Sequence, residues 1–276
     1  MDEEEHPGLD RTEIIRYHEG DRYPADDVVA REEPLEVRLN GQPLVYLMRL
    51  PGDDAVLAAG FCFSEGLISS REDIELLHHC RDGESPGEVA TGVPGNLVEI
   101  KAKLTSGAER FDVARVVRTG CGGADLEREV DLAGIKVDSD VRFSPEVITG
   151  VPDLLLEGQE VFQATGGTHG AGLFGVDGRV VVVKEDVGRH NAVDKVLGHL
   201  LLSGDSVEDK GLILSGRLSY EMVLKGARVG IPLLCSVSAP TALGVGVGRK
   251  TGVTLVGFLR GGSFNVYSHP ERIGGG

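Results

Sequence analysis

Residues 179–216 read "RVVVVKEDVGRHNAVDKVLGHLLLSGDSVEDKGLILSG", and this stretch decides the fold class. The valine run 180–183 and the apolar run 211–214 each predict a buried strand, and the segment 188–204 has the length and apolar spacing of a helix. Short apolar strands that alternate with helices are typical of a sheet covered by helices on both faces. We therefore expect an α/β domain around this stretch.

The same alternation extends to both sides. "GAGLFG" at 170–175 and the strand at 179–186 flank Asp177-Gly178, which predicts a hairpin. Pro145 suits the first position of a helix over 144–159. Toward the C-terminus the pattern predicts a helix at 219–230, a strand at 232–239, a short helix from Thr241 and a strand at 253–259. We expect one three-layer α/β domain over residues 144–276.

A smaller, mainly β or mixed region is expected over residues 31–143. Asn40-Gly41 stands between two apolar runs and is a strong hairpin signal. Asp53 or Asp54 can cap a helix that continues to Gly66.

The remaining N-terminal segments give weaker signals. Residues 69–95 are polar and predict irregular structure, whereas 96–104 and 112–120 predict strands, the second leading into a cysteine loop. Residues 1–30 mix charge, Pro and Gly without periodicity, so we expect a mobile acidic lead-in or an edge segment.

Composition limits the classes of partner. The chain has 276 residues, of which 41% are hydrophobic, enough for one large domain or two unequal ones. Its formal charge of −16 argues against a broad basic face for nucleic acid or anionic lipid. The acidic start and the lack of an apolar run of about 18 residues predict a soluble, cytoplasmic protein without a membrane span.

One cysteine stands in a glycine-rich loop. Cys121 is flanked by Gly120, Gly122 and Gly123 in "VRTGCGGAD", residues 117–125, and the missing β-carbons let a substrate approach the thiol closely. The dipole of a following helix would favour the thiolate, while nearby acidic residues would oppose it. A redox pair, a metal ligand, a nucleophile and a structural cysteine are all open at this point.

The other cysteines give less reason to expect chemistry. Cys62 and Cys235 lie in apolar runs and are interpreted as core residues. His78-His79-Cys80 is a group of ligand types without a companion pair, and no C-x-x-C occurs, so we expect no zinc or other metal site. The signature of zinc deaminases is likewise incomplete, because its second cysteine is missing.

Polar residues and glycines gather where predicted strands end. "TGGTHGAGLF" at 165–174 offers backbone N–H groups and His169 to an anion, although a tight turn would explain it as well. A second set crowds the strand-to-helix junction at 184–195, and it consists of Asp186, Arg189, His190, Asn191 and Asp194. Strand ends of open α/β sheets bind ligands, but a salt-bridged helix start is the alternative.

Two further strand ends repeat this composition, at Ser215-Gly216-Arg217 and within 258–268. Several strand ends that offer Gly, Ser and Arg to one face predict a pocket of local positive potential. We expect it to take a small polyanion such as a nucleotide diphosphate.

These segments together resemble the formate dehydrogenase accessory protein family, FdhD. The motifs follow in the order of the family from about residue 30 onward: "LAAGFCFSEGLI", "RTGCGG", "TGGTHGAGLF", "EDVGRHNAVDKVLG", "SGRLSYEMVLK", "SVSAPTALGV" and "LVGFLRGGSFNVYSHPERI". A series of this length is far more specific than any single glycine pattern.

The resemblance implies a sulfurtransferase. In this family a loop cysteine takes sulfur from a cysteine desulfurase as a persulfide and passes it to the molybdenum cofactor before insertion into the formate dehydrogenase apo-enzyme. The resemblance also implies a cytidine-deaminase-like fold without zinc, a homodimer, and binding of bis-molybdopterin guanine dinucleotide, which guanine nucleotides would mimic.

Matched residue by residue, Cys121 is the persulfide carrier. The positions that match the family's cofactor contacts are Phe258, Leu259, Arg260, Gly261, Gly262 and Ser263. Arg189, His190 and Arg217 are expected to complete the pocket. Many members carry C-x-x-C in the loop, whereas here Ala124 replaces the second cysteine, so no partner thiol lies within the loop.

Two hypotheses follow. In the first, Cys121 accepts sulfane sulfur and delivers it to molybdenum or tungsten held by the cofactor, since a single cysteine suffices to carry a persulfide. In the second, the protein is a non-covalent chaperone that binds and delivers the guanine-dinucleotide cofactor.

Overall fold

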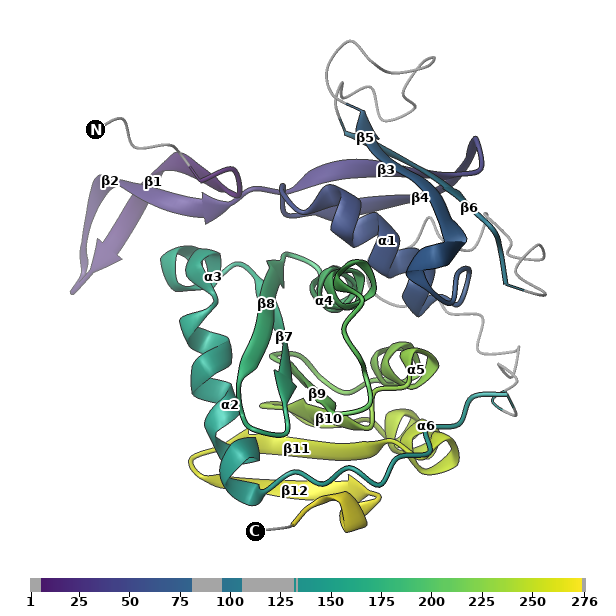
Figure 1. The fold of residues 1–276 in the computed structure, drawn as a ribbon. Coiled ribbons are helices and arrows are strands. Elements are labelled where there is room, and N and C mark those ends of the chain that lie inside the picture. The colour runs from purple at the N-terminus through teal and green to yellow at the C-terminus, as the bar shows by residue number, and fades with distance from the viewer. Residues whose placement is uncertain (1–5, 81–95, 106–131, 133, 275–276) are drawn as a thin grey trace.

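The computed structural model describes residues 6–80, 96–105, 132 and 134–274. Within these ranges the strands form a sheet of six, a sheet of four and a separate hairpin (Figure 1). No helix in these ranges is long and apolar enough to span a membrane.

The first two strands correct the expectation for the N-terminus. β1 (Leu9–His18) and β2 (Asp21–Ala30) pair antiparallel along their full length, where the sequence predicted a mobile acidic lead-in or an edge segment. Most of their side chains are exposed, so backbone pairing rather than a hydrophobic face holds the hairpin. This is why no apolar periodicity marks it in the sequence.

The sheet of four has the order β4-β3-β6-β5 and packs against one helix. Its elements are β3 (Glu33–Leu39), β4 (Gln42–Arg49), α1 (Asp54–Ser64), a 3₁₀ turn η1 (Arg71–Asp73), β5 (Ile74–Cys80) and β6 (Leu97–Ala102). The predicted hairpin at Asn40-Gly41 is confirmed, with φ of 52° and 79°, the positive values a tight two-residue turn needs. The predicted strand at 112–120 lies outside the described residues.

β5 contradicts the irregular structure predicted for residues 69–95. It is an edge strand that pairs antiparallel with β6, and Cys80 is its one fully buried residue. Ile74 and Leu77 pack against the core of the sheet of four only partly buried, and the strand ends in His78-His79, so its hydrophobic alternation is weak.

The sheet of six has the order β12-β11-β10-β9-β7-β8. Its strands are β7 (His169–Gly175), β8 (Val180–Asp186), β9 (Lys210–Leu214), β10 (Leu233–Ser236), β11 (Thr254–Arg260) and β12 (Ser263–Ser268). Strands β9, β10 and β11 are parallel to one another, while β7 runs antiparallel to β9, and β12 to β11.

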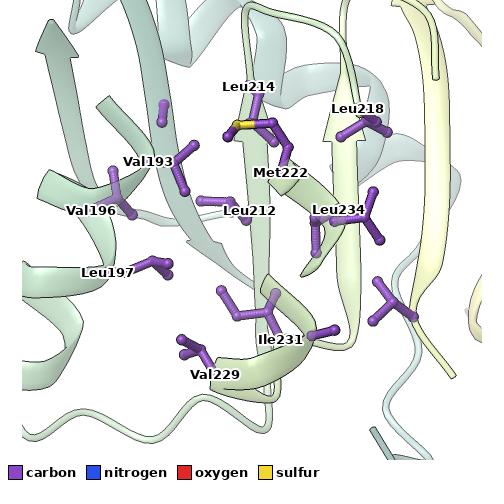
Figure 2. Packing of buried hydrophobic residues seen from close by; sticks show 14 of the residues in the cluster. Val193, Val196, Leu197, Leu212, Leu214, Leu218, Met222, Val229, Ile231 and Leu234 are labelled. Atoms are coloured by element: carbon purple, nitrogen blue, oxygen red, sulfur yellow. The ribbon is translucent and has the colours of Figure 1, made fainter. Parts of the chain in front are cut away.

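Helices cover both faces of this sheet, as predicted. One face carries α4 (Arg189–Ser203), α5 (Tyr220–Val229) and α6 (Ala242–Thr251), whose apolar side chains meet those of the strands in the cluster of Figure 2. The other face carries α2 (Pro145–Glu157), followed by α3 (Glu160–Thr165); a last 3₁₀ turn, η4, covers Pro270–Arg272. The likeness to cytidine deaminases stays a prediction.

The predicted domain boundary at 143/144 falls just before α2. Val137 and Phe143, on its N-terminal side, already pack into the two clusters that flank the sheet of six. The guanidinium of Arg272 holds the intervening backbone by donating to the carbonyl oxygens of Ser139 and Val137.

Helices α1 and α4 join the two sheets through a contact between their backbones. A β-carbon on Gly60 would lie 1.8 Å from the carbonyl oxygen of Asp194, and one on Gly198 would lie 2.0 Å from that of Val56. Real β-carbons do not approach so closely, so any larger residue at either position separates the helices.

We predict that Gly198→Ala lowers the free energy of unfolding by about 1–3 kcal/mol, because the added methyl group forces α1 away from α4. Gly246→Ala in α6 is the matched control, since a β-carbon there meets nothing within 4 Å. It should be neutral or stabilising by about 1 kcal/mol through helix propensity. Urea unfolding of both variants measures the difference, and equal midpoints would contradict the account of the contact.

Candidate functional site

A cavity of about 750 Å³ opens at one end of the strands of the sheet of six, between α2, α3 and the turn that joins β11 to β12. This volume lies in the range of small-molecule sites. Its lining residues are Thr149, Pro152, Asp153, Leu155, Leu156, Gln159, Phe162, Gly166, Gly167, Thr168, His169, Val187, Ser215, Val237, Leu259, Arg260, Gly261 and Gly262.

The strand directions explain why these residues meet. The parallel strands β9, β10 and β11 have their carboxyl ends at the cavity, and this brings Ser215, Val237 and Arg260 together. Because β7 is antiparallel to β9, the first residue of β7, His169, lies at the same end of the sheet as the carboxyl ends of the parallel strands. Loops at the carboxyl ends of parallel strands are the usual ligand sites of open α/β sheets.

The turn between β11 and β12 presents open backbone to the cavity. Gly261 and Gly262 both have positive φ, at 58° and 74°, and a β-carbon on either would meet nothing within 4 Å. Arg260 is exposed beside them and places its guanidinium 5.8 Å from the ring centre of Phe258. A cation next to unhindered backbone N–H groups suits an anionic oxygen.

Of the six matched positions, 258–263, four line the cavity. Phe258 and Ser263 do not line it but adjoin it, since the Ser263 hydroxyl donates to the carbonyl oxygen of Arg260 at 3.2 Å. Phe258 has φ of 53°, which is strained for a residue with a β-carbon and turns the strand end.

His169 is neutral at pH 7 in this setting. Burial lowers the pKa of the imidazole below its ordinary value of 6.5, and electrostatic interaction with Arg189 and His190 lowers it further. Its Nδ1 lies 3.3 Å from the hydroxyl oxygen of Ser215, which also accepts a hydrogen bond from the N–H of Gly170 at 3.0 Å. The pair is a neutral, preset polar group in the cavity wall.

The α2 side of the cavity was missed in the sequence analysis. Thr149, Pro152, Asp153 and Leu156 recur at helical spacing, so one stripe of α2 faces the cavity. Beyond the helix end, Gln159 is 4% exposed, and its Nε2 has no hydrogen-bond partner. A single stripe with two polar residues carries little signal in a sequence.

The predicted residues near the starts of α4 and α5 are not among those that line the cavity. His190 Nε2 lies 2.7 Å from Glu221 Oε2, Arg217 is exposed, and neither lines the cavity. Arg189 also does not line it, although its side chain packs beside Gly216 and its buried Nε has no partner. That these three complete one pocket with Arg260 stays a prediction.

The acidic and amide side chains at 184–195 serve the fold. Asn191 donates to the carbonyl oxygen of Met48 at 2.7 Å, and Asp186 pairs with buried Lys195 at 2.8 Å. Asp194 pairs with buried Lys225 at 2.9 Å. The salt-bridged alternative is therefore the correct one for this group, although the ion pairs are buried rather than solvated.

The cysteines within the described ranges are buried. Cys62, Cys80 and Cys235 lie in the interior, and burial raises the pKa of Cys62 to about 12 and also raises that of Cys235. The core interpretation of Cys62 and Cys235 is confirmed. Cys121 lies outside the described residues.

The chain after Cys121 is anchored far from the cavity. Val137 donates its N–H to the carbonyl oxygen of Thr251 at 2.7 Å, at the end of α6 and just before β11 begins. Arg260 is the last residue of β11, so the Thr251 anchor and Arg260 lie at opposite ends of this strand, roughly 20 Å apart along it.

His78, His79 and Cys80 lie on β5, where His79 Nε2 is 3.5 Å from Asp54 Oδ2. Among the residues whose structure is described, no group of three or more His, Cys, Asp or Glu side chains is placed to hold a metal ion.

Comparison with known proteins gives consistent matches over most of the chain. Residues 30–274 match the model of the FdhD/NarQ family. The chain is 41% identical over 272 residues to the sulfur carrier protein FdhD of Streptomyces coelicolor, covering 96% of this chain and 95% of that protein. It is 39% identical over 268 residues to the protein of the same name from Saccharolobus solfataricus, with 95% and 97% covered.

One solved structure is similar throughout. It is the crystal structure described as a formate dehydrogenase accessory protein from Desulfotalea psychrophila, with a TM-score of 0.75 and 30% sequence identity. The match covers 97% of this chain and all of that one, at 100%.

We predict that Arg189→Gln raises the pKa of His169, because one of the positive charges that disfavour the imidazolium is removed. The pKa should stay below 6.5, since burial is the larger cause. In wild type the folded state binds this proton less readily than the unfolded chain, so His169 lowers stability as the pH falls below 6.5. An NMR titration of the ring protons, assigned with His169→Gln, measures both values.

The control for this titration is Arg249→Gln, which removes an exposed charge at the end of α6. It should leave the pKa of His169 unchanged. A wild-type pKa at or above 6.5, or one that Arg189→Gln does not move, would contradict the electrostatic account of the site.

Proposed function

This chain belongs to the FdhD/NarQ family, and from that premise we propose that it is a sulfur carrier that serves formate dehydrogenase. The observation that carries the proposal is the match along nearly the whole chain to relatives named sulfur carrier proteins. The cysteine positions support it, because the thiols in the described ranges are buried while Cys121 lies in a glycine-rich segment.

Cys121 is the carrier in this proposal. Its thiolate attacks the outer sulfur of a persulfide on a cysteine desulfurase; the sulfur–sulfur bond breaks, and the desulfurase leaves as a thiolate. Cys121 then holds the sulfane sulfur as its own persulfide. With Ala124 in place of a second loop cysteine, no neighbouring loop thiol attacks that persulfide and releases the sulfur early.

The acceptor is the metal of a bis-molybdopterin guanine dinucleotide, which this protein binds as cargo. The cavity supports this part, because an apolar wall from α2 and α3 faces the cationic turn at Arg260. Phosphate oxygens fit that turn, where a guanidinium stands beside Gly261 and Gly262. Guanine nucleotides are the simplest probes of this site.

The remaining partners follow from the same premise. The sulfur source is a cysteine desulfurase, the recipient is a formate dehydrogenase apo-enzyme, and the protein works as a homodimer in the cytoplasm. The formal charge of −16 is consistent with protein partners and a small anionic cargo rather than nucleic acid.

Chaperoning without covalent chemistry is the second candidate. The observation that favours it is the lining of the cavity, which offers Arg260 and backbone N–H groups but, among the described residues, no thiol. The first prediction below separates the two functions.

Wild type incubated with a cysteine desulfurase and cysteine should gain a sulfur adduct of about 32 Da, and Cys121→Ala should gain none. Intact-protein mass spectrometry measures the adduct, with desulfurase activity shown in parallel. Cys121→Ala should still bind the cargo but fail to mature formate dehydrogenase. Maturation that survives Cys121→Ala would support the chaperone instead.

Arg260→Gln should weaken GDP binding by about tenfold to a hundredfold, because a charge-assisted hydrogen bond to phosphate is lost. Arg249→Gln removes the same charge from an exposed position outside the cavity and should change the affinity less than twofold. Calorimetric titration measures both. Equal losses in the two variants would show that only overall charge matters and would remove the phosphate role of Arg260.

A further inference from the structure

The β1–β2 hairpin is a two-stranded ribbon with little support from the rest of the protein (Figure 1). Among the described residues its strands pair only with each other, and β2 meets α3. The side chains of Ile15, Tyr17 and Tyr23 are 56%, 70% and 44% exposed. A lone two-stranded hairpin is marginally stable in water, and further strands are the usual remedy.

The turn of the hairpin determines which backbone groups face outward. The two-residue turn at 19–20 has φ of 53° and 96° and is closed by the pair of His18 and Asp21. The two residues that close such a turn bond to each other, and every second pair along the ribbon repeats this. At the far end the N–H of Arg31 donates to the carbonyl oxygen of Gly8 at 2.8 Å, in the same alternation. The odd-numbered residues of β1 therefore direct their N–H and C=O groups away from β2.

The outer edge of β2 is closed, whereas that of β1 is open. The outward positions of β2 include Pro24, which has no N–H group, and Val28, whose N–H donates to Asp27 at 2.9 Å. On β1 the outward N–H groups have no acceptor among the described residues; they belong to Arg11, Glu13, Ile15 and Tyr17. Proteins block exposed edges with proline, bulges or covering segments, so an unblocked edge of this length suits pairing with another strand.

The charges of β1 match those of a second copy in one antiparallel register. When Ile14 lies opposite Ile14 of the second copy, Arg11 faces Tyr17 of that copy and no like charges face each other. This register pairs the strand over almost its whole length, and each outward N–H meets a carbonyl oxygen. Centring the pairing on Glu13 would oppose two carboxylates, and centring it on Ile15 would leave Arg11 beside the turn. A parallel arrangement would align every charge with itself.

We propose that the outer edge of β1 pairs antiparallel with β1 of a second copy, so that the two-stranded hairpins of both copies form one continuous sheet. The arrangement has twofold symmetry, the commonest for homo-oligomers. The inference rests on the homodimer of the proposed function and names its contact surface, while it does not depend on the sulfur chemistry.

Sedimentation equilibrium of the full chain and of two matched proline variants tests the contact. Glu13→Pro removes an outward N–H of β1 without touching the ladder to β2, so the dimer dissociation constant should rise at least about tenfold. Asp26→Pro is the control, because Asp26 lies directly opposite Glu13 and the change removes the same charge from the outer edge of β2. It should alter the dissociation constant less than about twofold.

Cysteine variants test the register. In the Cys121→Ala background, Ile14→Cys should form a disulfide-linked dimer under mild oxidation, because the twofold pairing brings both Cα atoms within about 5 Å. Thr12→Cys lies on the same face two residues away and should not, since the two copies of this position are about 14 Å apart along the strands.

Each outcome decides the inference. A dimer that Glu13→Pro leaves intact overturns the β1 contact alone, and equal losses in both proline variants overturn it by assigning the effect to a disrupted hairpin. Equal cross-linking of Ile14→Cys and Thr12→Cys overturns the register. A monomeric wild type overturns the inference together with the homodimer, and the sulfur adduct then still tests the carrier function by itself. Circular dichroism checks that all variants are folded.

Discussion

The contact between α1 and α4 is the constraint on which the rest of the structure depends, because it joins the sheet of four to the sheet of six. Gly60 and Gly198 allow the helix backbones to touch. Beside this contact Asp194 accepts from Ser64 at 2.6 Å and from Lys225 at 2.9 Å. Burial alone would lower the pKa of Lys225, but Asp194 and Glu65 raise it above its usual value, so the ammonium stays charged inside the protein. Removing one member of such a buried pair destabilises by about 3–5 kcal/mol.

The two faces of the sheet of six differ in what they carry. The α4 face carries the buried ion pairs and the junction with the N-terminal region, including Lys195 with Asp186. The opposite face is covered by α2 and α3, which leave the cavity open at the strand ends. The buried ion pairs and the residues that line the cavity thus lie on opposite sides of the same strands, and the cavity wall includes the neutral imidazole of His169 and the exposed Arg260.

The parts of the fold with strong hydrophobic periodicity were predictable. The helix over 188–204, the hairpin at Asn40-Gly41 and the α/β alternation were found because burial of one face imposes a repeat on the sequence. The β1–β2 hairpin and β5 were missed because exposed or edge strands lack that repeat. In the site, Arg260 and its glycines were marked by their composition, whereas Gln159 was not. The Gln159 amide lies against Gly170, and no local pattern shows that two such residues touch. His190 and Arg217 do not line the cavity, because a strand end alone does not determine the direction of the side chains that follow it.

The central claim is that the cargo binds on the α2 face, and a crystal structure of the protein with GDP tests it most directly. The account predicts the diphosphate at the turn of Arg260, Gly261 and Gly262, and the base against the wall formed by α2 and α3. A nucleotide bound instead on the α4–α5 face, between His190 and Arg217, would contradict it.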